Sequence, residues 1–282
     1  MRTFHHAEFP PARLAERRAT ASVCVPARNE ATTIEATVGT LIDLRDRGAV
    51  DQVVVVDGAS TDGTATIAAE LGAQVHQQDD LLPQMGPALG KGDAMWRSLT
   101  VLDGEIVCFV DADSEDFGPH FPCGLLGPIL FGDGVQYAKG FFRRPFKSGE
   151  AVAPEGGGRV TELTARPLLE VFYPELGDCW QPLAGEIAAR RSLLERLPWA
   201  TGYGVEIAQL IDVYRLIGVD AMAQVDLDVR QNRHQSLSAL RPMAASVVAA
   251  VAQRLVREGR LDSALPTVER PPLRSLRVPV PE

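Results

Sequence analysis

The feature that most constrains the fold is a repeated order of strand-like runs, polar loops and helical stretches in the first 115 residues. Apolar runs at residues 22–25, 53–56 and 106–110 are rich in β-branched side chains and do not alternate with polar ones, which is typical of strands buried on both faces. The first two are each followed by a polar loop and by apolar residues at helical spacing. This order predicts an α/β fold with a mostly parallel sheet.

The rest of the chain continues this pattern less regularly. It predicts further strands at residues 73–76, 135–142 and 222–229, and helices at 93–101, 159–172, 205–216 and 243–258. A segment rich in Gly and Pro at 148–158 is expected to form a loop or lid, and prolines mark an irregular tail after residue 265. We expect an N-terminal arm (1–20), one large domain (21–240) and a C-terminal helix with the tail (241–282).

Composition excludes several classes of protein. The 282 residues, 45% apolar and 23% charged, are typical of a globular protein with a full core. Apolar runs fall well short of the roughly 20 residues that span a bilayer, and the N-terminus lacks the apolar core of a signal peptide, so we expect a cytoplasmic protein without membrane contact. The four cysteines lack zinc-site spacing, and the net charge of -9 argues against nucleic-acid binding.

Two aspartates directly follow the strand predicted at residues 106–110. Asp111 and Asp113, with Ala112 between them, leave the carboxyl end of a buried strand, where open α/β sheets bind ligands. Such a pair can hold Mg²⁺ or Mn²⁺ against a diphosphate, because hard cations take oxygen ligands. The same pattern also occurs as a polar turn or a helix cap, so the neighbouring loops must decide between the two interpretations.

Loops after the other parallel strands are expected at the same edge of the sheet. They comprise residues 26–30, residues 57–63 and the segment after Val229. Asp57 and Ser60 are candidates for binding a nucleoside, whereas Asp62 fits ordinary turn and cap chemistry. Convergence of these loops predicts one cleft suited to a sugar nucleotide.

Four further motifs carry charge near predicted helix starts or strand ends. Lys91, between two glycines, could bring an ammonium group to a diphosphate or be solvated in a turn. Arg159, after three glycines, predicts an anion site for a second substrate. Glu206 could orient an acceptor hydroxyl or only complement a helix dipole. The polar run at 230–234 could bind metal or acceptor, or form a solvated edge.

Taken in order, these motifs resemble the retaining GT-A glycosyltransferases that include glucosyl-3-phosphoglycerate synthase. The resemblance covers nearly the whole chain and implies a GT-A fold, a Rossmann-like sheet flanked by helices with a C-terminal helical extension. It implies a nucleotide-sugar half (21–114) and an acceptor half (115–240). It is carried by Phe4-His5-His6-Ala7-Glu8-Phe9-Pro10, Pro26-Ala27-Arg28-Asn29-Glu30, Gly90-Lys91-Gly92, Asp111-Ala112-Asp113, Gly158-Arg159-Val160-Thr161-Glu162-Leu163, Gly202-Tyr203-Gly204-Val205-Glu206 and Glu269-Arg270-Pro271-Pro272.

The resemblance also implies a function. The protein would be a homodimeric, metal-dependent hexosyltransferase that moves glucose or a related hexose, with retention, from a UDP-sugar to a small phosphorylated or carboxylated acceptor, best matched by 3-phosphoglycerate. Catalysis would rest on Glu206, Lys91 and Asp113. The donor would be bound by Pro26, Ala27, Arg28, Glu30, Asp57, Ser60, Lys91, Asp111, Ala112 and Asp113. The acceptor would be bound by Gly158, Arg159, Val160, Thr161, Arg230 and His234, and the metal by Asp113, Asn232 and His234.

One segment departs from the family's pattern. The family reads Val-Arg-x-His-Arg-Asn after the last strand, with that His as a metal ligand, and this chain reads Val229-Arg230-Gln231-Asn232-Arg233-His234. In register, Asn232 replaces the metal ligand and His234 replaces an acceptor-binding Asn. Either Asn232 holds the metal more weakly through a neutral oxygen, or His234 moves in, or the acceptor differs.

Three alternatives stay open. A transferase of the same donor chemistry could act on a sugar or nucleoside acceptor. A sugar-phosphate nucleotidyltransferase also uses a parallel sheet and a metal, but it needs a Gly-rich first loop where this chain has residues 26–30. A non-catalytic nucleotide-sugar binding module would result if Asn232 abolished productive metal binding. Release of UDP that depends on metal and on an added acceptor would exclude the binding module.

Overall fold

The computed structural model describes residues 1–144, 146–148, 151–153, 158–230 and 236–261. Its strands are β1 Arg2–His5, β2 Ala21–Ala27, β3 Gln52–Asp57, β4 Gln74–Gln77, β5 Ile106–Phe109, β6 Tyr137–Arg143, β7 Phe146–Ser148, β8 Ala151–Ala153, β9 Ile187–Arg190 and β10 Met222–Val229. Its α-helices are α1 Pro11–Ala15, α2 Ile34–Asp46, α3 Thr64–Glu70, α4 Lys91–Ser98, α5 His120–Phe131, α6 Arg166–Phe172, α7 Arg191–Leu194, α8 Val205–Ile217 and α9 Leu237–Arg257. Short helical turns are η1 His6–Glu8, η2 Pro83–Met85, the π-helix η3 Thr161–Ala165, η4 Pro174–Leu176 and η5 Val219–Ala221.

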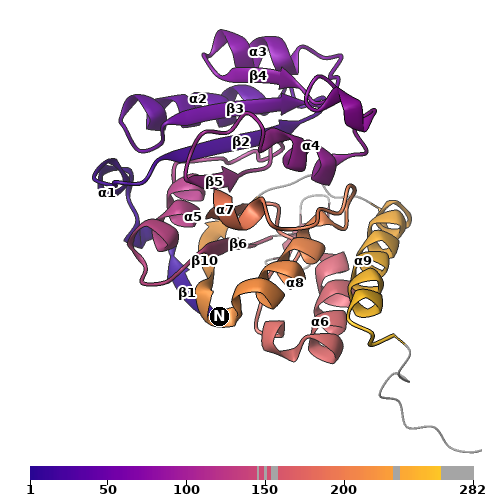
Figure 1. Cartoon of the computed structure of the whole chain (residues 1–282). Helices are drawn as coiled ribbons and strands as arrows, with labels where there is room; N and C mark the ends of the chain where they lie inside the picture. The colour runs from indigo at the N-terminus through magenta and orange to yellow at the C-terminus, as the bar shows by residue number, and fades with distance from the viewer. Residues whose placement is uncertain (145, 149–150, 154–157, 231–235, 262–282) are drawn as a thin grey trace, which may run out of the picture.

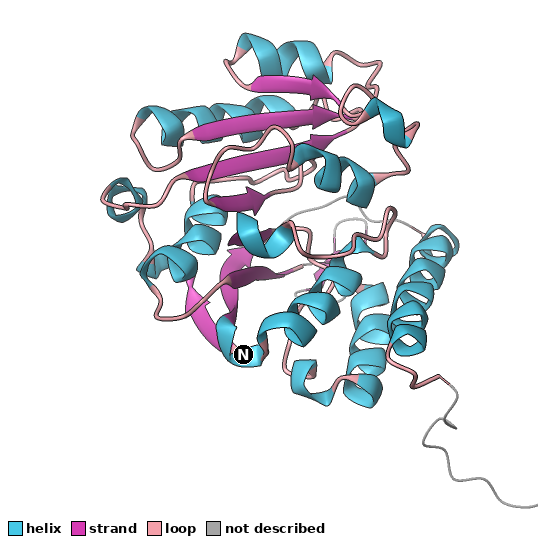
Figure 2. Ribbon diagram, viewed as in Figure 1, coloured by secondary structure: helices cyan, strands magenta, loops and turns pink. Residues whose placement is uncertain are grey.

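The main sheet has the strand order β1-β10-β6-β9-β5-β2-β3-β4, with helices packed along it (Figures 1 and 2). Strand β9 is antiparallel to both of its neighbours, β5 and β6, and the other pairs in this sheet are parallel. The predicted α/β class with a mostly parallel sheet is confirmed.

Burial on both faces explains the unbroken apolar runs. In β2 and β3, Cys24 and Val54 belong to the core on one face of the sheet, whereas Val23 and Val55 belong to the core on the other face. Successive side chains of a strand point to opposite faces, so a strand covered on both sides has no polar positions to alternate with. The central strands β2 and β3 are therefore apolar over most of their length, with the polar residues Ser22, Gln52 and Asp57 at or near their ends.

Several segments differ from the sequence-based expectation. Strand β1, in the expected N-terminal arm, pairs in parallel with β10 at the edge of the main sheet. The helix predicted at 159–172 is divided into η3 and α6, and the predicted loop at 148–158 overlaps a hairpin of β7 and β8. Helix α5 and strand β9 were not predicted. The division into domains stays a prediction, and the tail after residue 261 lies outside the described residues.

Helix α9 packs against α8 in this fold (Figure 1). By length and composition alone it could cross a membrane, as no other helix in the described part of the chain could. Helices that pack in globular proteins can have the same length and apolar composition. Here the guanidinium of Arg254, 2% exposed, lies 2.5 Å from the carboxylate of Asp212 on α8. This buried ion pair ties one side of α9 to the rest of the molecule.

Candidate functional site

Six charged residues gather at one edge of the sheet and are called the charged cluster below. Strands β5 and β10 bring their carboxyl ends to this edge, and β9 begins there because it runs antiparallel to β5. Helices α4 and α8 add residues from their first turns. The members are Lys91, Asp111, Asp113, Glu186, Glu206 and Arg230.

Opposite charges alternate through the charged cluster. The Lys91 ammonium lies 2.6 Å from Asp111 Oδ1 and 3.0 Å from Glu206 Oε1. The Arg230 guanidinium lies 3.3 Å from Asp111 Oδ2 and 2.7 Å from Asp113 Oδ1, and it also pairs with Glu186. The structure thus brings together the three predicted catalytic residues, and Arg230 connects both aspartates.

The pKa shifts follow from burial and from these pairs. Burial opposes the charge of Lys91, but Asp111 and Glu206 outweigh it and raise the pKa of the ammonium. Burial likewise opposes ionisation of Asp111, but Lys91 and Arg230 outweigh it and lower the pKa of that carboxyl. For Glu186 burial dominates, and its pKa is raised although Arg230 favours the charged form. Lys91 and Asp111 are therefore held as an ion pair at neutral pH.

Close packing of backbone places Lys91 beside Glu206. A Cβ on Gly92 would lie 1.9 Å from the carbonyl oxygen of Ala200, so only glycine allows the start of α4 to approach the segment before α8. The Asp93 N–H donates to the Thr201 carbonyl at 3.1 Å across the same contact. The glycines around Lys91 therefore serve helix packing in addition to any contact with phosphate.

The first two loops are bound to each other next to the charged cluster's edge of the sheet. The Asn29 N–H donates to Ser60 Oγ at 2.8 Å, and the Thr61 N–H donates to Asn29 Oδ1 at 2.9 Å. Asp57, 1% exposed, accepts from the Ser60 N–H at 3.0 Å through Oδ2. Its Oδ1 is buried without a hydrogen-bond partner among the described residues. A buried acceptor of this kind is suited to a ligand N–H.

The remaining predicted donor residues lie in or beside these loops. Pro26 and Ala27 are the last residues of β2, and Arg28 and Glu30 follow. The Glu30 N–H donates to Thr64 Oγ1 at 2.9 Å. Asp62 accepts from the N–H groups of Ala31 and Thr64, which is the turn and cap role expected for it. Ala112 is buried between the two aspartates.

Four of the predicted acceptor residues, Gly158 to Thr161, lie directly before η3 or at its first position. Gly158 has a φ of +74°, a left-handed conformation that favours glycine, and its carbonyl accepts from the Glu162 N–H at 3.0 Å. Val160 and Thr161 are buried. Arg159 and the other three keep their acceptor role as a prediction. Asn232 and His234 lie outside the described residues, so the same holds for their roles.

Glu186 was missed by the sequence analysis. It directly precedes β9, a strand of four residues that was not predicted. The expectation that functional side chains follow parallel strands excluded it, because an antiparallel strand brings its amino end to the same edge. The signal that was available is a Gly185-Glu186 pair before a short apolar run. A Cβ on Gly185 would lie 2.4 Å from Lys91 Nζ, so this glycine leaves room for the charged cluster.

A second group of polar side chains joins β1 to β10. His6 Nε2 lies 2.6 Å from Asp228 Oδ2. The ligand atoms of His5, His6 and Asp228 lie within 4.8 Å of one another, close enough for a metal ion. However, His5 Nδ1 accepts from the Ala7 N–H, so that in a neutral ring the proton lies on Nε2, where it blocks that atom as a metal ligand. Arg143 also pairs with Asp228 at 3.1 Å and already balances its charge. This group is better explained as a polar contact between two strands.

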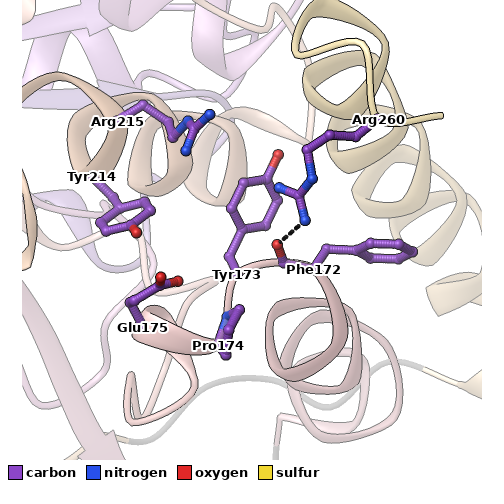
Figure 3. A pocket seen from close by; sticks show the side chains of 7 residues that line it. All are labelled: Phe172, Tyr173, Pro174, Glu175, Tyr214, Arg215 and Arg260. Atoms are coloured by element: carbon purple, nitrogen blue, oxygen red, sulfur yellow. Dashed lines mark hydrogen bonds between the residues drawn. The ribbon is translucent and has the colours of Figure 1, made fainter. Parts of the chain in front are cut away.

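A cavity of about 340 Å³ lies between α6, the end of α8 and the segment after α9 (Figure 3). Arg215 and Arg260 point into it, but both pair with Glu258, at 3.2 Å and 2.9 Å. Arg215 is nine residues along α8 from Glu206, or roughly 13 Å at 1.5 Å per residue. The cavity is therefore separate from the charged cluster, and its cations are already balanced by a carboxylate.

Comparison with known proteins identifies sequence relatives over most of the chain. Residues 22–122 match the model of glycosyl transferase family 2. Glucosyl-3-phosphoglycerate synthase of Petrotoga mobilis is 43% identical over 272 residues, which cover 93% of this chain and 82% of that protein. The enzyme of the same name from Mycobacterium tuberculosis is 47% identical over 238 residues, covering 83% of this chain and 73% of that protein.

Solved structures give the same result. Mannosyl-3-phosphoglycerate synthase from Rubrobacter xylanophilus superposes with a TM-score of 0.85 at 47% identity, covering 92% of this chain and 82% of that chain. Glucosyl-3-phosphoglycerate synthase from M. tuberculosis, in complex with Mn²⁺, UDP-glucose and phosphoglyceric acid, superposes with a TM-score of 0.82 at 43% identity, covering 90% and 87%. Another structure of that enzyme contains Mg²⁺ and UDP.

Proposed function

The chain belongs to the glucosyl-3-phosphoglycerate synthase family of glycosyltransferases, and from this premise we propose that it transfers glucose from UDP-glucose to 3-phosphoglycerate with the help of a divalent cation. The predicted GT-A fold is confirmed by the structures that it matches. The observation that carries the proposal is the charged cluster. It holds Lys91 and Asp113 at the same edge of the sheet as the loops at residues 26–30 and 57–63, which are proposed to bind the nucleoside.

The residues at this edge fit a divalent cation and a nucleoside diphosphate. Asp113 is half exposed and offers hard oxygen ligands, as Mg²⁺ and Mn²⁺ prefer. The unpartnered Oδ1 of Asp57 is a buried acceptor at the site proposed for the base. When bound, the cation would stabilise the negative charge that develops on the departing diphosphate. Asn232 or His234 would complete its ligands.

Each remaining residue has a distinct part in the proposed reaction. Lys91 would donate hydrogen bonds to the leaving diphosphate, and Glu206 would hold its ammonium in place. Arg159 and the backbone of the adjoining glycine would bind the phosphate and carboxylate of the acceptor. For retention, the acceptor hydroxyl would attack from the face that UDP leaves, and the departing oxygen could take its proton. Preorganised positive charge would supply most of the rate enhancement.

The test is UDP release by the purified protein from UDP-glucose and Mg²⁺ or Mn²⁺, with and without 3-phosphoglycerate, and with mass spectrometry of the product. We expect release that requires both metal and acceptor and gives a glucosylated phosphoglycerate. Asp113→Asn should lower kcat by at least about 100-fold, because a neutral amide is a poorer ligand for a hard cation. Wild-type protein that binds UDP and Mn²⁺ but yields no such product would refute the proposed acceptor.

A second candidate is transfer of mannose to the same acceptor. It is favoured by the likeness to the mannosyl-3-phosphoglycerate synthase of R. xylanophilus. The same assay with GDP-mannose in place of UDP-glucose distinguishes the two. A higher kcat/KM with GDP-mannose would select mannose, and the reverse would select glucose.

We also propose a homodimer in the cytoplasm. Four buried cysteines with free thiols support a reducing compartment.

The dimer is supported by exposed apolar side chains on α6 and α9, among them Val171, Val248 and Val256, which offer a surface for a second copy of the chain. Light scattering after size-exclusion chromatography should give about twice the mass of one chain, and the mass of one chain would refute the dimer.

A further inference from the structure

We propose that Glu186 is a positioning residue, which balances part of the charge of the Arg230 guanidinium beside the two aspartates and thereby sets the affinity of the site for its divalent cation. The inference rests on the proposed function and adds a residue that no motif pointed to. It follows from what Arg230 contacts and from the cost of burying Glu186.

Arg230 is shared among three carboxylates. It is 1% exposed, as is Glu186, and it pairs with Glu186 on one side and with Asp111 and Asp113 on the other. Asp113, the proposed metal ligand, is about half exposed and lies 2.7 Å from the guanidinium. A cation at Asp113 must compete with Arg230 for the same carboxylate. The more of the guanidinium charge is balanced by Glu186, the weaker this competition is.

Backbone contacts hold Glu186 in place. Its carbonyl accepts from the Gly140 N–H at 2.9 Å, and a Cβ on Gly140 would lie 3.2 Å from Glu186 Cβ. The carbonyl of Ala184, two residues earlier, accepts from the buried Lys139 ammonium at 2.7 Å. The segment before β9 is therefore pressed against β6, and the carboxylate has little freedom to follow Arg230 if that side chain moves.

The burial of Glu186 calls for a functional reason. Its Oε2 is buried without a hydrogen-bond partner among the described residues, although a carboxylate can accept about four hydrogen bonds. Half of its acceptor capacity is thus unused in a site where desolvation is costly, so its net contribution to stability is small. Its charge, by contrast, acts on Arg230, on Lys91 and on the nearby Arg144. Glu186 therefore balances part of the positive charge that these three cations place near the two aspartates.

The experiment compares Glu186→Gln with wild type by titrating Mn²⁺ into protein saturated with UDP, using calorimetry and the electron paramagnetic resonance of free Mn²⁺. The amide keeps an oxygen that can accept from Arg230 and removes the charge. We expect the Kd for Mn²⁺ to rise about tenfold, whereas KM for UDP-glucose at saturating Mn²⁺ should change by less than about threefold. A merely structural residue would lower Tm without changing Mn²⁺ affinity.

The matched control is Asp212→Asn. It neutralises another carboxylate in a buried pair with arginine, Asp212 with Arg254, on the contact of α8 with α9. It should lower Tm and leave the Kd for Mn²⁺ unchanged. If Glu186→Gln does not fold, Glu186→Asp decides, because the shorter side chain keeps the charge and withdraws it from Arg230, and a weaker affinity for Mn²⁺ is again expected.

A wild-type Kd for Mn²⁺ in the folded Glu186 variant would overturn the inference. That outcome differs from failure of the proposed function, in which wild-type protein itself would form no glucosylated product. Binding of Mn²⁺ with UDP is measured without turnover, so the inference is tested even if the acceptor proves to be another molecule.

Discussion

At the scale of single residues, Asp57 offers the most direct test of the donor site. One oxygen accepts from the Ser60 N–H at 3.0 Å, and the other is buried without a partner among the described residues. In Asp57→Asn the amide oxygen would keep the bond to Ser60, which turns the NH₂ group toward the base. A donor would then face the N–H of uracil, so we expect the Kd for UDP by calorimetry to rise at least about tenfold.

The Tm of the same variant separates binding from folding. Because the replaced oxygen has no partner among the described residues, Asp57→Asn should leave Tm nearly unchanged. Asp62→Asn in the adjacent turn should leave the Kd for UDP unchanged. An unaltered Kd for UDP in Asp57→Asn would show that the buried oxygen does not face the base.

At the scale of elements, the contact between α4 and the start of α8 controls the position of Lys91. In Gly92→Ala the new methyl group would meet the Ala200 carbonyl at 1.9 Å, so the two segments must separate. We expect a loss of about 1–3 kcal/mol of unfolding free energy by denaturant titration. A displacement near 1 Å would also open the 3.0 Å contact of Lys91 with Glu206 and lower kcat by about 100-fold.

Gly39→Ala in α2 is the matched control. A Cβ at Gly39 meets nothing within 4 Å, and alanine is favoured over glycine inside a helix by about 0.5–1 kcal/mol. This variant should be slightly more stable than wild type with unchanged kcat. If Gly92→Ala behaved like Gly39→Ala, the close contact would not position Lys91.

Elements also explain what the sequence could and could not predict. Residues 53–56 and 106–110 are predictable as strands because burial on both faces leaves an unambiguous apolar run. Asp111 and Asp113 follow from the end of such a run, and Lys91 from the two glycines beside it before a predicted helix. Helix α5 contains Pro122 and Pro128 and is buried nearly all round, so neither propensity nor periodicity indicates a helix. The reversed direction of β9, which brings Glu186 to the site, is set by pairing with β5 and β6 and leaves no local signal.

At the scale of the whole molecule, the four cysteines report on both cores. Cys24 and Cys179 lie in the core on one face of the sheet, and Cys108 and Cys123 lie in the core on the other. No described cysteine forms a disulfide, and all four are buried. Exposure of these thiols therefore requires that helices leave the sheet on both faces, which makes them probes of cooperative unfolding.

Burial determines how these thiols respond to pH. It raises the pKa of Cys24 and of Cys123 to about 12 and that of Cys179 to about 11, and it raises the pKa of Cys108 as well. An unfolded thiol ionises near pH 8.5, so above that pH the unfolded chain releases protons that the folded chain keeps. The stability that the buried thiols contribute is therefore complete below about pH 8.5 and declines as pH rises toward the folded values. We expect Tm to fall between pH 8 and pH 10.

Chemical labelling tests the burial of the same thiols. Ellman's reagent at pH 8 should label the native protein slowly, whereas in guanidinium all four thiols should react at once. UDP with Mn²⁺ should slow native labelling further, because ligands that bind the folded state reduce the unfolded population. Rapid labelling of one thiol in the native protein would show instead that its part of the core opens independently of the rest.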